Sequence, residues 1–374
     1  EELDALRKRA EADKMTFRYR RPEALPTAED AERAAAEGRP VVVRLRNPGR
    51  DVTIHDDAFG AVTMPAEAQD DFILRKADGW PTYHLANVVD DARMGVNYVC
   101  RGQEFLGQTW RHVLLREALG YPEPGYCHLP LIMDMQGRKL SKRDGAVEVH
   151  SFRKMGYLPE ALVNFLALLG WKSGDRERYR LEELIEAFSP AGLGKANAKF
   201  DRDKLLAFNT DAAAAADLDQ LVAAFRDYLE LNPDVGIPAD DDARLRHLLE
   251  CTRGFRTFAD VAAKAAVLFG PDDAFDYDAK AVKKVLAKND GAGGEVLREL
   301  RAILPACNWT RADLEELLED YGRARELKMG KVAQPLRVAV TGTTVSPPIH
   351  DTLLLLGKDK TLGRIDRCLA QTGA

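Results

Sequence analysis

The sequence predicts an α/β fold that is followed by an all-α region. Strand, helix and strand patterns alternate between residues 94 and 133, which is typical of a βαβ unit in a parallel sheet covered by helices. Beyond residue 150, apolar residues recur almost wholly at helical spacing. The first 80 residues combine short helical and short strand patterns, so they predict a small α+β part.

The N-terminal α+β part is predicted to begin with one or two short helices in the first forty residues. Residues 41–46 then alternate with period two, which places Val41, Val43 and Leu45 on one face of a half-buried strand. The segments Val52–Ile54 and Phe72–Leu74 are predicted to form two more short strands.

The βαβ part follows in a defined order. We expect a helix over 82–91, a strand over 94–100, a helix over 105–119, and a strand over 128–133. The last of these is a nearly continuous apolar run, as expected for a strand that is buried on both faces.

The C-terminal half is predicted to be a helical bundle and not a solenoid, because no fixed-period repeat is evident. A helix over 159–169 begins at Pro159 and stops at Gly170. Residues 232–242 and the Gly-rich 290–294 are predicted loops. The other predicted helices are 181–188, 211–231, 241–265, 279–288, 293–303, 310–327, 349–357 and 360–370.

Composition excludes several classes of protein. The 374 residues suggest about two or three domains, and no stretch approaches the roughly 18 apolar residues of a membrane span. The charged start has no apolar core, so it is not a secretory signal. Five scattered Cys without a C-x-x-C pair argue against disulfides and a zinc ribbon, and for a reducing compartment.

The charge is unevenly distributed along the chain. The formal net charge is −6, yet residues 323–374 hold nine Lys and Arg against four Asp and Glu, a net charge of +5. Residues 101–154 hold nine against six, a net charge of +3. Local basic surfaces can bind nucleic acid even in an acidic protein. The alternative is an ordinary solvated surface.

The sharpest local feature is a basic loop at residues 137–145 (GRKLSKRDG), directly after the predicted strand 128–133. In open α/β sheets, ligands bind at the carboxyl ends of the strands. The two lysines, Lys139 and Lys142, could neutralise charge that develops on a triphosphate during transfer. The alternative is a basic surface turn that has no catalytic or binding function.

A small polar pocket is predicted at the same sheet edge. Arg101 ends the strand 94–100 and offers a planar fork that suits a carboxylate. Tyr83 and Asn87 are four residues apart on a predicted helix and so share one face. The alternatives are a surface ion pair of Arg101 with Glu104, a core-edge Tyr83 and a capping or solvated Asn87.

Other common catalytic motifs are missing from the sequence. The sequence has no G-x-G-x-x-G, Walker loop, G-x-S-x-G or H-E-x-x-H motif, which argues against dehydrogenases, P-loop enzymes and common hydrolases. Cys127 beside His128 lacks the spacing of a zinc site.

Taken together, these segments resemble a bacterial glutamyl-tRNA synthetase, which is a class I aminoacyl-tRNA synthetase. Order and spacing both match, so the joint signal is specific, although each piece alone is not. The matching segments are 78–91 (DGWPTYHLANVVDD), 94–96 (MGV), 99–102 (VCRG), 114–120 (LLREALG), 128–132 (HLPLI), 139–143 (KLSKR), 156–162 (GYLPEAL) and parts of 330–342.

The resemblance implies a partial Rossmann catalytic domain with an α+β insertion, followed by a helical anticodon-binding region. Residues 1–77 would be the acceptor-stem-binding insertion, and 78–134 the second Rossmann half. Residues 135–210 would hold the KLSKR loop and the stem-contact region, and 211–374 the anticodon-binding region.

The resemblance also implies the roles of single residues. Lys139, Ser141, Lys142 and Arg143 would be the catalytic loop. The glutamate substrate would be bound by Tyr83, Asn87 and Arg101, with Arg101 facing its carboxylate. Contacts to ATP would come from His128, Leu131 and Lys142.

Three departures from the family pattern bear on these expectations. Nothing like the His-Ile-Gly-His signature of the first Rossmann half occurs, so we expect an N-terminally truncated chain that shows no glutamate activation by itself but binds tRNA weakly. No Cys lies near residues 19–22, where some relatives bind zinc, so a zinc site is not expected. Residues 103–105 (QEF) replace two acids and a His or Trp of many relatives.

The implied activity is that of a glutamate–tRNA ligase. Glutamate and ATP, accompanied by Mg²⁺, would give glutamyl-adenylate, and the glutamyl group would pass to tRNA(Glu). Charging of tRNA(Gln) as well stays open. A cytoplasmic monomer without a membrane partner is expected. The alternative is a tRNA-binding protein of the same family without ligase activity.

Overall fold

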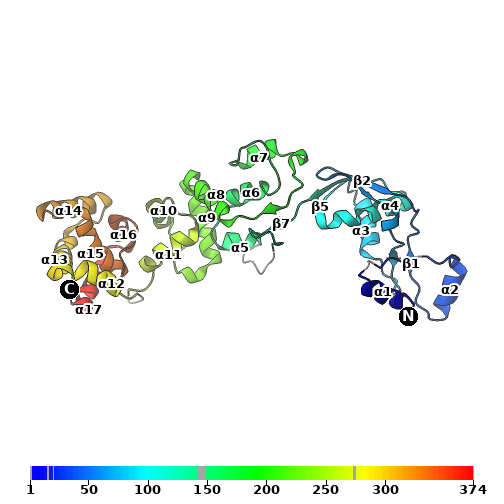
Figure 1. Ribbon diagram of the computed structural model, residues 1–374. Coiled ribbons are helices and arrows are strands. Elements are labelled where there is room, and N and C mark those ends of the chain that lie inside the picture. The colour runs from blue at the N-terminus through cyan, green and yellow to red at the C-terminus, as the bar shows by residue number, and fades with distance from the viewer. Residues whose placement is uncertain (1, 15–16, 20, 141–147, 273–274, 374) are drawn as a thin grey trace. The chain divides into compact units, whose positions relative to one another are not determined.

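The computed structural model describes residues 2–14, 17–19, 21–140, 148–272 and 275–373 (Figure 1). The chain forms two compact units. The first unit holds the described residues of Glu1–Lys139, Ala167–Glu177 and Glu182–Phe200, and the second holds those of Leu140–Leu166, Arg178–Leu181 and Asp201–Ala374.

A four-stranded sheet forms the centre of the first unit. Its strands lie in the order β3 (Gly60–Met64), β2 (Val52–Asp56), β6 (Gly125–Leu129) and β5 (Tyr98–Gly102). The pair β2–β3 is antiparallel, whereas β6 runs parallel to both β2 and β5. Strands β5 and β6 with the intervening helix α4 (Thr109–Leu119) confirm the predicted βαβ unit.

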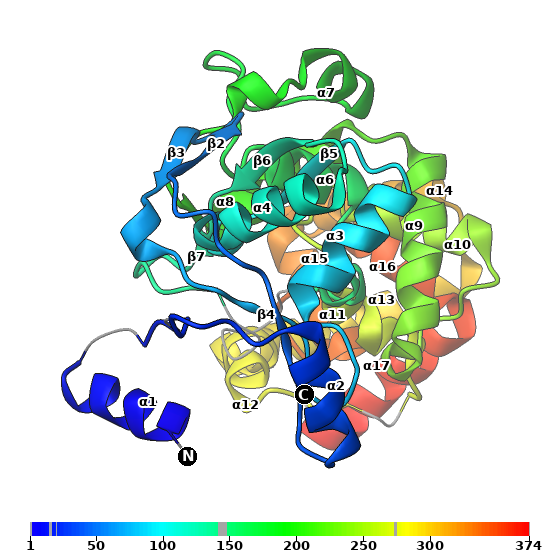
Figure 2. The same ribbon diagram turned by 90° about the vertical axis from the view of Figure 1, so that its right-hand side faces the viewer.

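Helix α4 packs against strand β2 of this sheet (Figure 2). It buries Trp110, Val113, Leu114 and Leu115. Gly120 ends the helix in the left-handed conformation that glycine adopts without strain. Helix α3 (Tyr83–Arg93) lies beside α4 and confirms the helix predicted over 82–91. The buried core consists of Leu45, Val52, Ile54, Phe72, Val88, Trp110, Val113, Leu114, Leu115 and Tyr126.

The predicted strand over 128–133 is wrong as a single element. The chain leaves the sheet after Leu129, and a separate two-residue strand, β7 (Ile132–Met133), pairs in parallel with β8 (Ala198–Lys199). Pro130 stands at the break, and a proline cannot donate a ladder hydrogen bond. The apolar run therefore crosses from one sheet to another.

The N-terminal part contains helices α1 (Glu2–Ala12) and α2 (Ala28–Ala36) and a short pair of strands. Strand β1 (Val43–Arg44) pairs with β4 (Ile73–Arg75), and η1 (Ala66–Ala68) is a single 3-10 turn. The prediction that Val41, Val43 and Leu45 share a buried face is wrong for Val43, which is exposed, while Leu45 enters the core. Only two residues of this segment pair with another strand, so the strand is too short to impose alternating buried and exposed side chains over residues 41–46.

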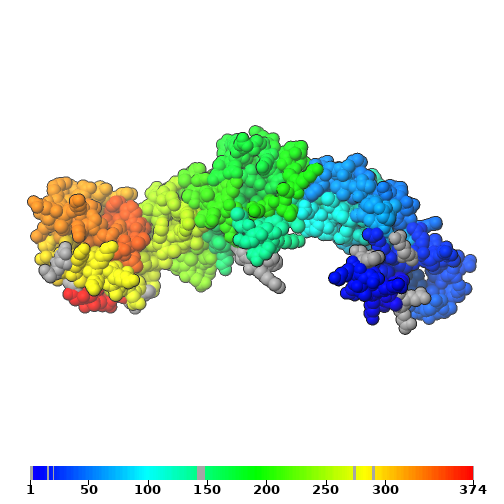
Figure 3. Space-filling model, viewed as in Figure 1, coloured from blue at the N-terminus to red at the C-terminus, as the bar shows by residue number. Residues whose placement is uncertain are grey.

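The second unit is almost entirely helical, as predicted, and its C-terminal helices pack closely in the space-filling view (Figure 3). The Gly-rich segment 290–294 was predicted to be a loop, but it lies inside α13. The unit and its neighbouring segments contain α5 (Val149–Lys154), α6 (Pro159–Ala167), α7 (Leu181–Ala187), η4 (Pro190–Gly192), α8 (Arg202–Ala215), α9 (Leu218–Leu231), η5 (Pro233–Val235), α10 (Asp242–Cys251), α11 (Phe258–Phe269), α12 (Ala279–Ala281), η6 (Val282–Leu286), α13 (Lys288–Ile303), η7 (Leu304–Ala306), α14 (Arg311–Ala324), α15 (Met329–Thr341), α16 (Ile349–Leu356) and α17 (Lys358–Thr372).

No helix in the described part of the chain is long and apolar enough to cross a bilayer.

Candidate active site

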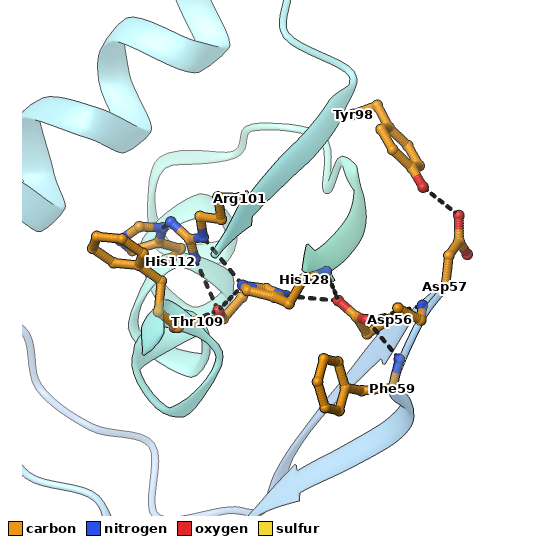
Figure 4. A network of polar contacts seen from close by, with 10 residues as sticks. Asp56, Asp57, Phe59, Tyr98, Arg101, Thr109, His112 and His128 are labelled. Atoms are coloured by element: carbon orange, nitrogen blue, oxygen red, sulfur yellow. Dashed lines mark hydrogen bonds and ion pairs between the residues drawn. The ribbon is translucent and has the colours of Figure 1, made fainter. Parts of the chain in front are cut away.

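Arg101 lies at the carboxyl end of β5, directly beside His128 on β6. Its guanidinium is held by three side chains (Figure 4). Nε donates to Nε2 of His128 at 3.1 Å, and Nη2 donates to the Thr109 hydroxyl at 2.8 Å. Nη1 lies 3.4 Å from Nδ1 of His112. These contacts fix the plane of the guanidinium, so its remaining N–H groups point in defined directions.

His128 is fully buried and connects Arg101 to Asp56. Nδ1 of the ring donates to Oδ2 of Asp56 at 2.6 Å. Burial lowers the pKa of His128, and the nearby Arg101 lowers it further, while Asp56 acts in the opposite direction. The neutral ring is thus favoured between a cation and a carboxylate.

Two further histidines lie on the other side of Arg101: His112 contacts Arg101, and His84 contacts His112. Nε2 of His112 lies 3.0 Å from Nδ1 of His84. Burial, followed by the charge of Arg101, lowers the pKa of His112 to about 3. Burial, followed by the charge of Arg111, lowers the pKa of His84 to about 4. Both rings are therefore neutral at pH 7 and can accept hydrogen bonds.

Tyr83 and Asn87 both lie on α3, one turn apart. The Tyr83 ring is half exposed, and its centroid lies 6.2 Å from that of His112 and 6.3 Å from that of Phe105. Oδ1 of Asn87 is buried and has no hydrogen-bond partner within the described ranges. Such an atom calls for a partner of its own, such as a substrate or a water.

The basic loop is described only at its beginning. Asp134 holds the turn by accepting from the Arg138 backbone at 2.8 Å and from Nε of Arg138 at 2.7 Å. The backbone bond to Arg138 is the main cause that lowers the pKa of Asp134. Lys139 is exposed and lies 3.7 Å from Glu104, so Glu104 pairs with this lysine and not with Arg101. The predicted loop residues Ser141, Lys142 and Arg143 lie outside the described residues.

Leu131 and His128 were predicted to contact ATP. The backbone of Leu131 is bonded on both sides, because its N–H donates to Asn197 at 3.1 Å and its carbonyl accepts from Ala198 at 3.0 Å. Both ring nitrogens of His128 have protein partners. The backbone N–H of this fully buried residue also donates to Asp56, at 2.9 Å, so neither its ring nor its N–H is left for ATP.

Sequence analysis missed Asp56, Thr109, His112 and His84 as parts of this site. A signal for Asp56 was available, since it lies two residues after the predicted strand 52–54 and the carboxyl ends of parallel strands meet at one edge. Thr109 and His112 share one face of α4 by helical spacing, but nothing in the pattern shows that this face meets Arg101.

Comparisons with known proteins identify the family of this chain. The family described as "tRNA synthetases class I (E and Q), catalytic domain" matches residues 1–207, and "Anticodon binding domain" matches residues 220–369. The chain is 38% identical to a glutamate–tRNA ligase of Anaeromyxobacter sp. (strain Fw109-5), over 99% of this chain and 76% of the relative. It is 41% identical to glutamate–tRNA ligase 1 of Erythrobacter litoralis, over 98% and 74%.

A solved structure supports the same relationship. The crystal structure of a glutamate tRNA ligase from Elizabethkingia meningosepticum, in complex with its amino acid, matches with a TM-score of 0.82. The two sequences are 28% identical, and the match covers 99% of this chain and 78% of the other. The chain therefore belongs to the glutamyl-tRNA synthetase family of class I aminoacyl-tRNA synthetases.

Proposed function

We propose that this protein is a glutamate–tRNA ligase, which activates glutamate with ATP and transfers the glutamyl group to tRNA(Glu). Relatives with this name match 98–99% of the chain at 38–41% identity. The observation that carries the proposal is the fixed guanidinium of Arg101 at the carboxyl end of the parallel strands, where α/β proteins bind their ligands.

Arg101 supports glutamate binding through the donors that it has left. A guanidinium has five N–H groups, and the three contacts to His128, Thr109 and His112 use three of them. One hydrogen on each Nη stays available for a carboxylate. Because the neutral histidines accept from Arg101 without adding charge, its positive charge is left for the substrate. Tyr83 and Asn87 are proposed to contact the rest of glutamate.

ATP is proposed to lie against the basic loop. Lys139, Ser141, Lys142 and Arg143 would stabilise charge on the phosphates while the adenylate forms, and Mg²⁺ would accompany the nucleotide. Leu131 and His128 are proposed to line the nucleotide site. The reaction needs little covalent help from the protein, because in-line positioning and charge stabilisation suffice.

The helical unit offers a surface that suits RNA. A pocket of about 590 Å³ between η6, α13 and α15 is lined by four exposed lysines, Lys284, Lys288, Lys328 and Lys331. Gln334 also lines it, and its Oε1 is buried without a partner among the residues that the structure describes. Lysines hold phosphates and an amide can read a base edge, so this surface supports binding of the tRNA anticodon region.

The same proposal includes domain boundaries at residues 77, 134 and 210. It also includes a monomeric enzyme in the cytoplasm. The enzyme would charge either tRNA(Glu) alone or both tRNA(Glu) and tRNA(Gln).

The test is charging of purified tRNA by the protein expressed from its complete reading frame. Radiolabelled glutamate, and in a parallel reaction glutamine, is supplied with ATP and Mg²⁺. We expect glutamate to become attached to tRNA(Glu) and glutamine to be rejected. Binding of tRNA without any charging would contradict the ligase and favour a tRNA-binding protein of the same family.

A further inference from the structure

Asp56 is a buried carboxylate at the carboxyl end of β2, and each of its oxygens accepts two hydrogen bonds. Oδ1 accepts from the backbone N–H groups of Ala58 and Phe59 at 3.0 and 2.8 Å. Oδ2 accepts from the backbone N–H of His128 at 2.9 Å and from its Nδ1 at 2.6 Å. The first pair holds the β2–β3 turn, whereas the second pair reaches the ring that contacts Arg101.

The ring of His128 can satisfy both neighbours in only one protonation form. The Nε–H of Arg101 is a donor and never accepts, so Nε2 of His128 must be bare. The single proton of the neutral ring then sits on Nδ1 and is donated to Asp56. Burial, which lowers the pKa of His128, keeps the second proton away.

We propose that Asp56 is a positioning residue for glutamate recognition: its bond to Nδ1 of His128 fixes the tautomer whose bare Nε2 holds Arg101. This inference rests on the proposed role of Arg101 in binding glutamate. Asp56 itself touches no substrate and acts through His128. The same division of labour, with a carboxylate that sets the tautomer and orientation of a histidine, is known from catalytic triads.

The substitution Asp56→Asn separates this role from the turn. The new amide has one oxygen, which accepts, and one NH₂ group, which donates. In one orientation the NH₂ group faces the backbone N–H groups of Ala58 and Phe59. In the other it faces the backbone N–H and the ring Nδ1 of His128. Only the ring can change from donor to acceptor. The NH₂ group is therefore expected to face His128, and the ring proton moves to Nε2, where it opposes the N–H of Arg101.

The matched control is Asp57→Asn. Asp57 is the next residue, carries the same charge and is exposed, and it accepts a hydrogen bond from the Tyr98 hydroxyl at 2.6 Å. In the network of Figure 4 it is bonded to Tyr98 and to neither His128 nor Arg101. Removal of this charge should leave the Arg101 cluster as it is.

The first readout is ¹⁵N NMR of histidine- and arginine-labelled protein, with the His128 signal assigned from its absence in His128→Gln. In the unaltered protein we expect the proton of His128 on Nδ1 and slow exchange of the Arg101 Nε–H with water. Asp56→Asn should move the ring proton to Nε2 and accelerate the Arg101 exchange, whereas Asp57→Asn should change neither signal. A proton on Nε2 in the unaltered protein overturns the inference, whatever the Asp56→Asn protein shows.

The second readout is ATP–pyrophosphate exchange by the protein from its complete reading frame, with tRNA present. Loss of the partner that orients a metal-binding histidine typically costs about 10- to 100-fold, and the same range is expected for a histidine that orients an arginine. We expect Asp56→Asn to raise the KM for glutamate by this factor, with smaller changes in kcat and in the KM for ATP. A merely structural role would lower the amount of active enzyme, and hence kcat, without raising that KM.

The two readouts separate the inference from the proposed function. Glutamate activation by the unaltered protein together with an unchanged KM in Asp56→Asn overturns the inference and leaves the function in place. A tautomer shift and released Arg101 in Asp56→Asn, without any exchange activity in the unaltered protein, supports the link from Asp56 to Arg101 and removes the function.

Discussion

Replacement of Arg101 by lysine tests how this site recognises a carboxylate. The guanidinium donates at once to His128 and Thr109, while it keeps one hydrogen on each Nη for the substrate. A lysine ammonium carries three donors on one atom and has no planar fork, so it cannot serve both protein partners and two carboxylate oxygens together. Arg101→Lys keeps the charge but loses the geometry.

The size of the effect follows from the bonds that are lost. A hydrogen bond to a charged group contributes about 1.5–3 kcal/mol, and each 1.4 kcal/mol corresponds to about tenfold in affinity. Loss of one of the two bonds to the carboxylate should therefore raise the KM for glutamate by about 10- to 100-fold. Nε2 of the fully buried His128 also loses its donor, which should lower the free energy of unfolding by about 1–3 kcal/mol.

ATP–pyrophosphate exchange with tRNA present, at varied glutamate and then at varied ATP, measures this effect. The matched control is Arg111→Lys, since Arg111 lies on α4 and pairs with Asp70 at 3.3 Å. The control should change the KM for glutamate by less than about twofold, because lysine keeps the charge beside Asp70 and this pair is not among the contacts of Arg101. Equal KM values for glutamate in Arg101→Lys and the unaltered protein would refute recognition by the planar fork.

Three further predictions concern the loop, the helical unit and the histidines. Lys142→Ala should lower the exchange rate on the order of 10²–10³-fold while tRNA affinity, measured by filter binding, stays nearly constant; an unchanged rate would make the loop a surface turn. Lys284→Ala and Lys331→Ala should each weaken tRNA binding and reduce the slope of log affinity against log salt by about 1, whereas Lys264→Ala, outside the pocket, should not. The pKa values of His112 and His84, about 3 and 4, lie below the value of 6.5 in the unfolded chain. Between pH 4 and pH 6.5 the unfolded chain therefore binds more protons than the folded chain. The urea midpoint should be highest above pH 6.5 and fall as the pH drops toward 4, and His112→Gln should flatten this fall; an equal fall in the variant would contradict it.

Local patterns predicted the elements that surround the site. The helical spacing of Trp110, Val113 and Leu114, with Gly120 beyond, predicted α4 and its end, because an amphipathic helix carries its own period and stop signal. The position of Arg101 at the end of a strand likewise follows from the local run of apolar residues. Its placement at the sheet edge needs only the rule that parallel strands share their carboxyl ends.

The partners of Arg101 could not be predicted in this way. Asp56 and His128 are 72 residues apart, and they meet because β2 joins the sheet beside β6. Periodicity tells which face of a strand is buried but not which strand lies next to it. The break at Pro130 shows the same limit, since an apolar run that predicts one strand serves two sheets.

The most direct measurement of the central claim is a crystal structure of the protein, from its complete reading frame, with a nonhydrolysable analogue of glutamyl-adenylate. We predict that a carboxylate of the glutamyl group lies within about 3.2 Å of both Nη atoms of Arg101, while Nε stays bonded to His128. A glutamyl carboxylate held elsewhere, with Arg101 bonded only to His128, Thr109 and His112, would contradict the account.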